Sequence, residues 1–159
     1  MKRFSFPSQP KSQNIVLQQD HIRVSLLTPC LIRVETGSFT DLPTQTVWFR
    51  DLGPVSWRVK EKGNIFAVRT KEAFFQINLT NGRVFSVKLA DGTVVRDFEH
   101  GILPGTARTL DAVNGAVKLE KSIMSRSGVS MMDDSKSLLL TEDGLIQARP
   151  VCTDRYYFA

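Results

Sequence analysis

Short runs of alternating apolar and polar residues are the feature that most constrains the fold of this chain. In the run from His21 to Leu26, Ile22, Val24 and Leu26 lie two positions apart. Alternation with a period of two is typical of a β-strand with one buried face. The same spacing recurs in five further runs, at Cys30, Ile32 and Val34, at Trp57 and Val59, at Phe66 and Val68, at Phe75, Ile77 and Leu79, and at Phe85, Val87 and Leu89.

Tight-turn residues separate these runs. Asn81-Gly82 and Asp91-Gly92 each follow an alternating run directly, and both residues of such a pair tolerate the positive φ that a type I′ hairpin turn requires. Successive hairpins form a meander whose single apolar face must be covered by a second sheet. No stretch of a dozen residues shows capped helical periodicity. The sequence therefore predicts an all-β fold, an antiparallel β-sandwich.

Length and charge set the class of protein. A chain of 159 residues suits one domain, so we expect residues 1–159 to form a single sandwich. The net charge is +5, but Lys and Arg are spread singly along the strands. This pattern indicates a solvated face rather than a nucleic-acid or membrane partner. The N-terminus has two basic residues without an apolar stretch behind them, which favours a cytoplasmic location.

Residues that carry chemistry are few. The chain has two histidines, His21 and His100, and two widely spaced cysteines, so we expect no metal site and no cofactor. No nucleophile elbow, P-loop or dinucleotide fingerprint occurs. The one pair of adjacent carboxylates is Asp133-Asp134. We interpret it as a turn or bulge in which Asp bonds its own backbone, with binding of sugar hydroxyls as the functional alternative.

Several ordered motifs resemble the N-terminal region of glycoside hydrolase family 31. They are LIRVE at 31–35 with the Phe39–Gln45 turn, GTARTLD at 105–111 followed by Asn114-Gly115 and Leu119-Glu120, SRSGV at 125–129 running into DDS at 133–135, and DRYYF at 154–158. They follow the family's order along nearly the whole chain. One departure is Val129, where relatives often have Trp, which removes a possible sugar-stacking ring.

The resemblance implies a galactose-mutarotase-like sandwich that precedes a catalytic (β/α)₈ barrel. In that family the barrel supplies the aspartate nucleophile and the aspartate acid/base that cleave α-glycosidic bonds with retention. A barrel needs about 250 residues, so neither catalytic carboxylate can be placed on this chain. What it implies here is a non-catalytic domain that packs on the barrel and helps shape the substrate pocket, with Asp133 and Asp134 as the substrate-binding candidates. We accordingly expect further polypeptide after Ala159.

Two alternatives remain open. A free-standing carbohydrate-binding module needs exposed aromatic platforms, for which Trp48, Trp57, Tyr156 and Tyr157 are the candidates. Trp57 alternates with charged residues, so we expect it to face the core. A small mutarotase-like enzyme would need clustered histidines and carboxylates, which the sequence scatters. If the chain is instead a domain of a larger glycosidase, it should expose an apolar patch where the barrel docks.

Overall fold

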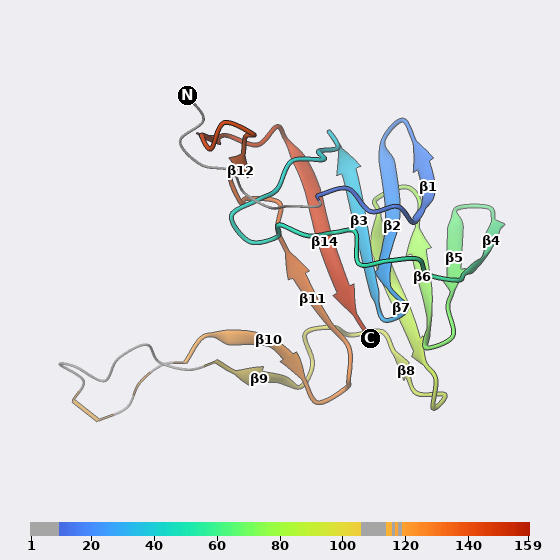
Figure 1. Cartoon of the computed structure of the whole chain (residues 1–159). Helices are drawn as coiled ribbons and strands as arrows, with labels where there is room; N and C mark the ends of the chain where they lie inside the picture. The colour runs from blue at the N-terminus through green and yellow to red at the C-terminus, as the bar shows by residue number, and fades with distance from the viewer. Residues whose placement is uncertain (1–9, 106–113, 116, 118) are drawn as a thin grey trace.

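The structure is a computed structural model that describes residues 10–105, 114–115, 117 and 119–159 (Figure 1). Two five-stranded antiparallel sheets make up its body. In spatial order the first sheet contains β1 (Ile15–Gln19), β2 (Ile22–Thr28), β3 (Leu31–Gly37), β14 (Cys152–Phe158) and β11 (Ser130–Asp133). The second contains β4 (Arg58–Lys62), β5 (Ile65–Arg69), β6 (Ala73–Asn78), β7 (Arg83–Leu89) and β8 (Val94–Val95).

Two short strand pairs stand outside these sheets. β9 (Ile102–Pro104) pairs with β10 (Lys121–Ser125), and this hairpin projects away from the body in Figure 1. β12 (Leu139–Leu140) pairs with β13 (Ile146–Gln147), and Thr44 forms a single bridge to Leu139. The β12–β13 pair and its surroundings, residues 137–151, are called the β13 lobe below.

The core lies between the two sheets, as the alternation predicts. Ile22, Val24 and Val34 from the first sheet and Phe75 and Ile77 from the second belong to one cluster of buried side chains. Inward-facing residues of two sheets interdigitate in this way in a sandwich. The predicted all-β antiparallel sandwich is therefore confirmed.

One predicted strand face is wrong, in β7. We expected Phe85, Val87 and Leu89 to share the core face, but Val84 and Val87 are fully buried while Phe85 is only half-buried. The pairing with β6 shifts register between Gln76 and Ile77, so that Phe85 is the unpaired residue of a β-bulge. An extra residue in one strand moves the alternation to the other face beyond it.

The expectation for Trp57 is also wrong. Its side chain is 38% exposed, and Val59 two positions later is 48% exposed. All five residues of β4, which begins directly after Trp57, are exposed, and this strand is the outer edge of the second sheet. Alternation on such a strand does not produce a buried face.

The predicted hairpin at Asn81-Gly82 is present, but its turn is longer than a two-residue type I′ turn. Asn78 and Arg83 are the last paired residues, so four residues form the turn. Gly82 has φ of +64°, and a Cβ atom on it would overlap the Cγ2 methyl of Thr36 in β3. Glycine is therefore required here by both backbone conformation and the close approach of the two sheets.

Three remaining expectations concern the cysteines, the motif at 105–111 and membranes. Cys30 lies half-buried in the turn between β2 and β3 rather than in a strand, and both cysteines are unpaired. Residues 106–113 of the motif lie outside the described residues. Within the described part of the chain, no helix has the length and apolar character needed to cross a bilayer.

Candidate functional site

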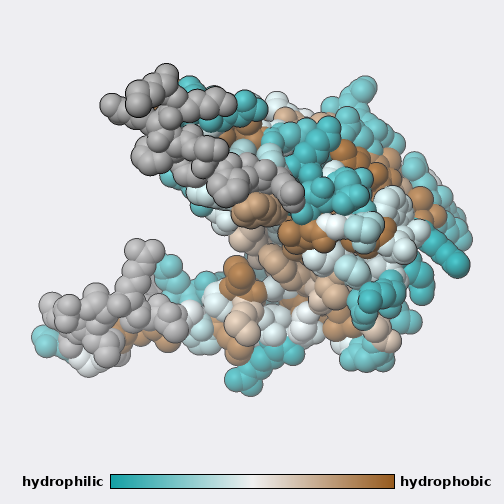
Figure 2. All heavy atoms as spheres, in the orientation of Figure 1, coloured by the Kyte–Doolittle hydropathy of each residue, from teal (hydrophilic) through white to brown (hydrophobic). Residues whose placement is uncertain are grey.

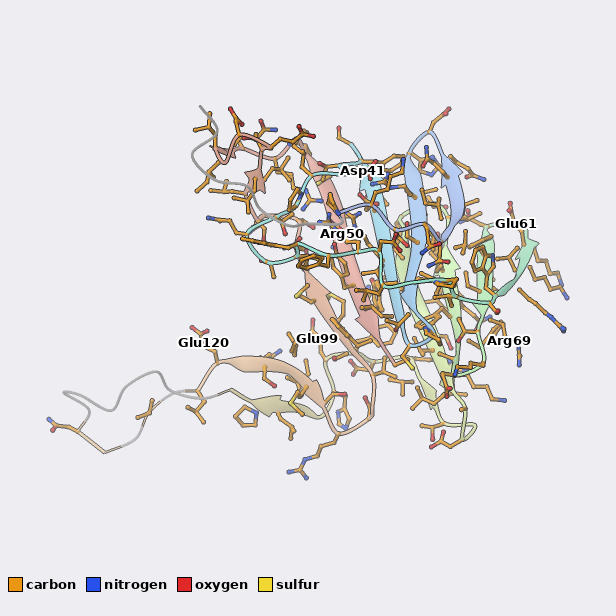
Figure 3. All side chains as sticks on the ribbon, in the orientation of Figure 1. Asp41, Arg50, Glu61, Arg69, Glu99 and Glu120 are labelled. Atoms are coloured by element: carbon orange, nitrogen blue, oxygen red, sulfur yellow. The ribbon has the colours of Figure 1, made fainter. Side chains whose placement is uncertain are left out.

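The outer face of the first sheet carries a network of buried charges. Because side chains alternate along a strand, Ile22 and Val24 face the core and Arg23 between them faces outward, as Arg33 and Glu35 do in β3. The segment between β3 and β4 crosses this face, and Asp41 and Arg50 on that segment are labelled in Figure 3. We expected singly spaced arginines to form a solvated face, and for Arg23 and Arg33 this is wrong because the segment covers them.

The network is held by short, paired contacts. Arg33 donates from Nε and Nη2 to the two carboxylate oxygens of Asp154, at 2.8 and 2.7 Å. Its Nη2 also lies 2.9 Å from Glu35, which in turn accepts two bonds from Arg23 at 2.6 and 2.9 Å. Arg149, from the β13 lobe, contacts Asp154 as well. Bidentate arginine–carboxylate pairs are among the strongest hydrogen-bonded pairs in proteins.

Burial and pairing act against each other on these groups. Burial alone would raise the pKa of Asp154, but hydrogen bonds and charges from Arg33 and Arg149 outweigh it and lower the pKa below its ordinary value. Burial would likewise lower the pKa of Arg33, and the bond to Asp154 outweighs it and raises that pKa. Both groups therefore stay charged across the neutral range, and the network ties β3, β14 and the β13 lobe together.

The candidate residues Asp133 and Asp134 have different surroundings. Asp133 ends β11 with its carboxylate 43% exposed, accepts the Ser135 backbone N–H at 3.0 Å and pairs with Arg155 at 3.0 Å. The bond to Ser135 confirms the expected turn. Asp134 is 1% exposed and accepts a hydrogen bond from the Thr44 hydroxyl at 2.9 Å. Of the two, only Asp133 could reach a bound sugar without rearrangement, and a substrate-binding role for either stays a prediction.

A further buried arginine lies on the covering segment and was not anticipated from the sequence. Arg50 is 0% exposed and donates to the Tyr156 hydroxyl at 2.6 Å and to the carbonyls of Pro10 and Leu42 at 2.9 and 3.0 Å. Tyr156 and Tyr157 are themselves 1% and 2% exposed. Neither tyrosine can serve as a sugar-stacking platform. Trp48 is half-buried, which leaves Trp57 as the exposed one of the four candidates.

The described residues contain no group of three or more His, Cys, Asp or Glu side chains arranged to hold a metal ion. The carboxylates that do come together, Glu35, Asp134 and Asp154, are each engaged by arginine or threonine and are 1% exposed or less. A general acid or nucleophile must reach its substrate within hydrogen-bonding distance. This cluster is built for holding the covering segment rather than for chemistry on a ligand.

Exposed apolar side chains gather on the two projecting elements. On the β9–β10 hairpin, Leu119, Ile123 and Met124 are 43%, 54% and 65% exposed and form what we call the hairpin patch. On the β13 lobe, three residues form the lobe patch, Leu145, Ile146 and Val151, at 63%, 56% and 97% exposed. In Figure 2, apolar surface is visible where the projecting hairpin joins the body. Apolar residues concentrated in this way mark interaction surfaces.

Comparison with known proteins finds similarity among solved structures. No protein-family model matches the chain, and no curated protein matches it. Among solved structures, a GH31 α-xylosidase from Xanthomonas citri is similar over 86% of this chain, at 15% sequence identity and a TM-score of 0.35. The matched region spans 17% of that chain. A TM-score this low does not establish a shared fold, so the fold class is based on the strand pairing described above.

Proposed function

We propose that this chain is the non-catalytic N-terminal β-sandwich domain of a family 31 glycoside hydrolase, packing on the catalytic barrel and helping shape its substrate pocket. The ordered motifs of the sequence support the family, and the free thiols agree with a cytoplasmic protein. The observation that carries the docking role is the exposure of the hairpin and lobe patches. Burying one such aliphatic side chain against a partner contributes about 1.5–3 kcal/mol.

The two patches and the ionic network fit one arrangement. The lobe patch lies on the β13 lobe, which the ion pair between Arg149 and Asp154 joins to β14. The Arg149 side chain in this pair is only 4% exposed. In the hairpin patch, Ile123 and Met124 lie on β10 and Leu119 precedes this strand. The Ser130 hydroxyl of β11 donates a hydrogen bond to the Ile123 carbonyl, which ties β10 to β11. Both elements are thus attached at one side of the first sheet, where β11 is the edge strand and β14 is its neighbour. A neighbouring domain seated against that edge would contact both patches at once.

A complementation experiment tests the docking role. The purified chain is added to a separately produced family 31 catalytic barrel that lacks its own sandwich domain, and the activity and thermal stability of the mixture are measured. We expect both to increase with the native chain and not with I123S/M124S or L145S/I146S. Val59→Ser is the matched control, because Val59 is 48% exposed but lies on β4, outside both patches. No increase with any form, or equal increases with all forms, would count against the proposal.

A free-standing carbohydrate-binding module is the alternative, and the exposure of Trp57 favours it. Trp57 borders a shallow pocket of about 270 Å³ together with Arg58 and Arg69. An exposed indole beside polar groups is a common platform for a sugar ring. Calorimetric titration with maltose and xylose oligosaccharides decides the matter. Heat of binding that disappears in Trp57→Ala would favour the module. Without heat of binding, the domain role would be the remaining proposal.

A further inference from the structure

A pocket of about 480 Å³ opens near the base of the β9–β10 hairpin. It is lined by side chains from β7, β11 and β14 and by the segment that follows β8. Glu99, labelled in Figure 3, belongs to that segment and lies close to the start of the hairpin. Pockets that bind small molecules commonly enclose about 300–1,000 Å³ and combine an apolar surface with a few polar groups.

The floor of this pocket is apolar and rigid. Phe98 and Tyr157 meet edge to face, with ring centroids 5.5 Å apart and planes at 70°. Both rings belong to the buried core, at 8% and 2% exposed. Met131 of β11 completes the floor. A ligand body placed here would meet aromatic and thioether surface that core packing already holds in position.

The rim carries three arginines, Arg83, Arg96 and Arg155. Arg155 is paired with Asp133. Arg83 and Arg96 are exposed, and among the described residues neither forms an ion pair with a carboxylate. Two unpaired guanidinium groups at the mouth of one pocket create a positive local field that attracts an anionic group.

The acidic side chains of the same pocket are already engaged. Asp97 accepts the backbone N–H groups of Glu99 and His100, at 2.9 and 3.2 Å. Glu99 pairs with Lys121 of β10 at 3.3 Å. The amide N–H groups that Asp97 accepts are neutral, so its carboxylate offsets one of the two unpaired arginines, and the unpaired side chains of the pocket still carry one excess positive charge.

We propose that this pocket binds a small organic anion, whose carboxylate or phosphate is held by Arg83 and Arg96 and whose apolar body rests on Phe98 and Tyr157. The planar guanidinium group can bind two oxygens of either a carboxylate or a phosphate with two parallel hydrogen bonds. The site is separate from the hairpin and lobe patches, so it holds or fails independently of the docking role.

Calorimetric titration of the full chain with phenyl phosphate and with benzoate tests the proposal. We expect one site per chain for at least one of these two probes. Inorganic phosphate lacks the ring and benzyl alcohol lacks the charge, so we expect each to bind at least about tenfold more weakly, since both the apolar and the charged contacts contribute. Binding of inorganic phosphate as tight as that of phenyl phosphate, or no heat with either aromatic anion, would overturn the proposal.

Substitutions of exposed side chains locate the site without threatening the fold. We expect Arg83→Ala and Arg96→Ala each to weaken the binding of the aromatic anion about fivefold or more, because each removes a charge-assisted hydrogen bond. Lys62→Ala is the control, an exposed cationic residue on β4, and should leave the affinity unchanged. Equal effects of all three substitutions, or no effect of the first two, would also overturn the proposal.

Discussion

Removing the charge of Asp154 is the sharpest test of the buried network. Asp154→Asn preserves the shape of the side chain but deletes the negative charge that faces Arg33 and Arg149. The carboxylate is 0% exposed and receives two bonds from Arg33, at 2.8 and 2.7 Å. Breaking a buried ion pair typically costs about 3–5 kcal/mol, because the remaining partner is left charged and desolvated.

The expected cost lies at the lower end of that range. Arg33 retains Glu35 at 2.9 Å, and the amide oxygen of asparagine can still accept one bond. We therefore expect Asp154→Asn to reduce the free energy of unfolding by about 3 kcal/mol at neutral pH. Asp133→Asn is the matched control, because its carboxylate is 43% exposed and its pair with Arg155 is solvated. Exposed pairs of this kind contribute about 0.2–1 kcal/mol.

Urea unfolding followed by circular dichroism measures both variants, and the comparison is valid where the denaturant slope is unchanged. The lowered pKa of Asp154 fixes the pH dependence. Its stabilisation is fully present above the ordinary aspartate pKa of about 3.9 and is lost as the pH falls through the lower pKa of the folded state. The difference between native chain and Asp154→Asn should therefore narrow in acid. A loss no larger than that of Asp133→Asn, or a difference that is the same in acid, would refute the reasoning.

The remaining predictions concern a turn and the two tyrosines. Alanine at positive φ costs about 1–2 kcal/mol, and Gly82→Ala should destabilise the chain by well more than that, because its Cβ would overlap Thr36. Gly63→Ala is the control, since Gly63 has φ of +56° and open space around it, and it should show only the backbone cost. Thermal melts compare the two variants, and equal losses of stability would contradict the close approach of Gly82 to Thr36. Burial raises the pKa of Tyr156 to about 12 and that of Tyr157 above its ordinary value. The ultraviolet absorbance of tyrosinate should therefore not rise near pH 10 while the chain is folded. A rise of that absorbance near pH 10 would show that the tyrosine rings are exposed.

The sheet architecture could be predicted because alternating apolar residues and turn residues mark the hairpins within short stretches of sequence. Ile22, Val24, Phe75 and Ile77 show the alternation that burial on one face produces, and all four are core residues. The errors arose where a strand departs from the regular pattern. The bulge at Phe85 depends on the pairing partner, which periodicity within one strand does not reveal.

The buried network could not be predicted for a related reason. The sequence pattern is the same whether the outer face of the sheet meets water or a covering segment, because in both cases Arg23, Arg33 and Glu35 alternate with apolar residues. The segment that covers them, between β3 and β4, has no periodicity that would place it there. One signal for the network was available in Glu35, an acidic residue that lies between two core-facing positions of its strand. An arginine on the neighbouring antiparallel strand could be its cross-strand partner. Arg23 is that partner, as the register of β2 and β3 shows.

We propose that this chain takes part in glycoside cleavage as a supporting domain and does not cleave the bond itself. Incubation of the purified chain with aryl α-glucoside and aryl α-xyloside, beside an intact family 31 α-xylosidase as positive control, tests this claim directly. The account predicts no release of the aryl group above the buffer blank. Release that rises in proportion to the concentration of the chain and follows it through every purification step would contradict the account.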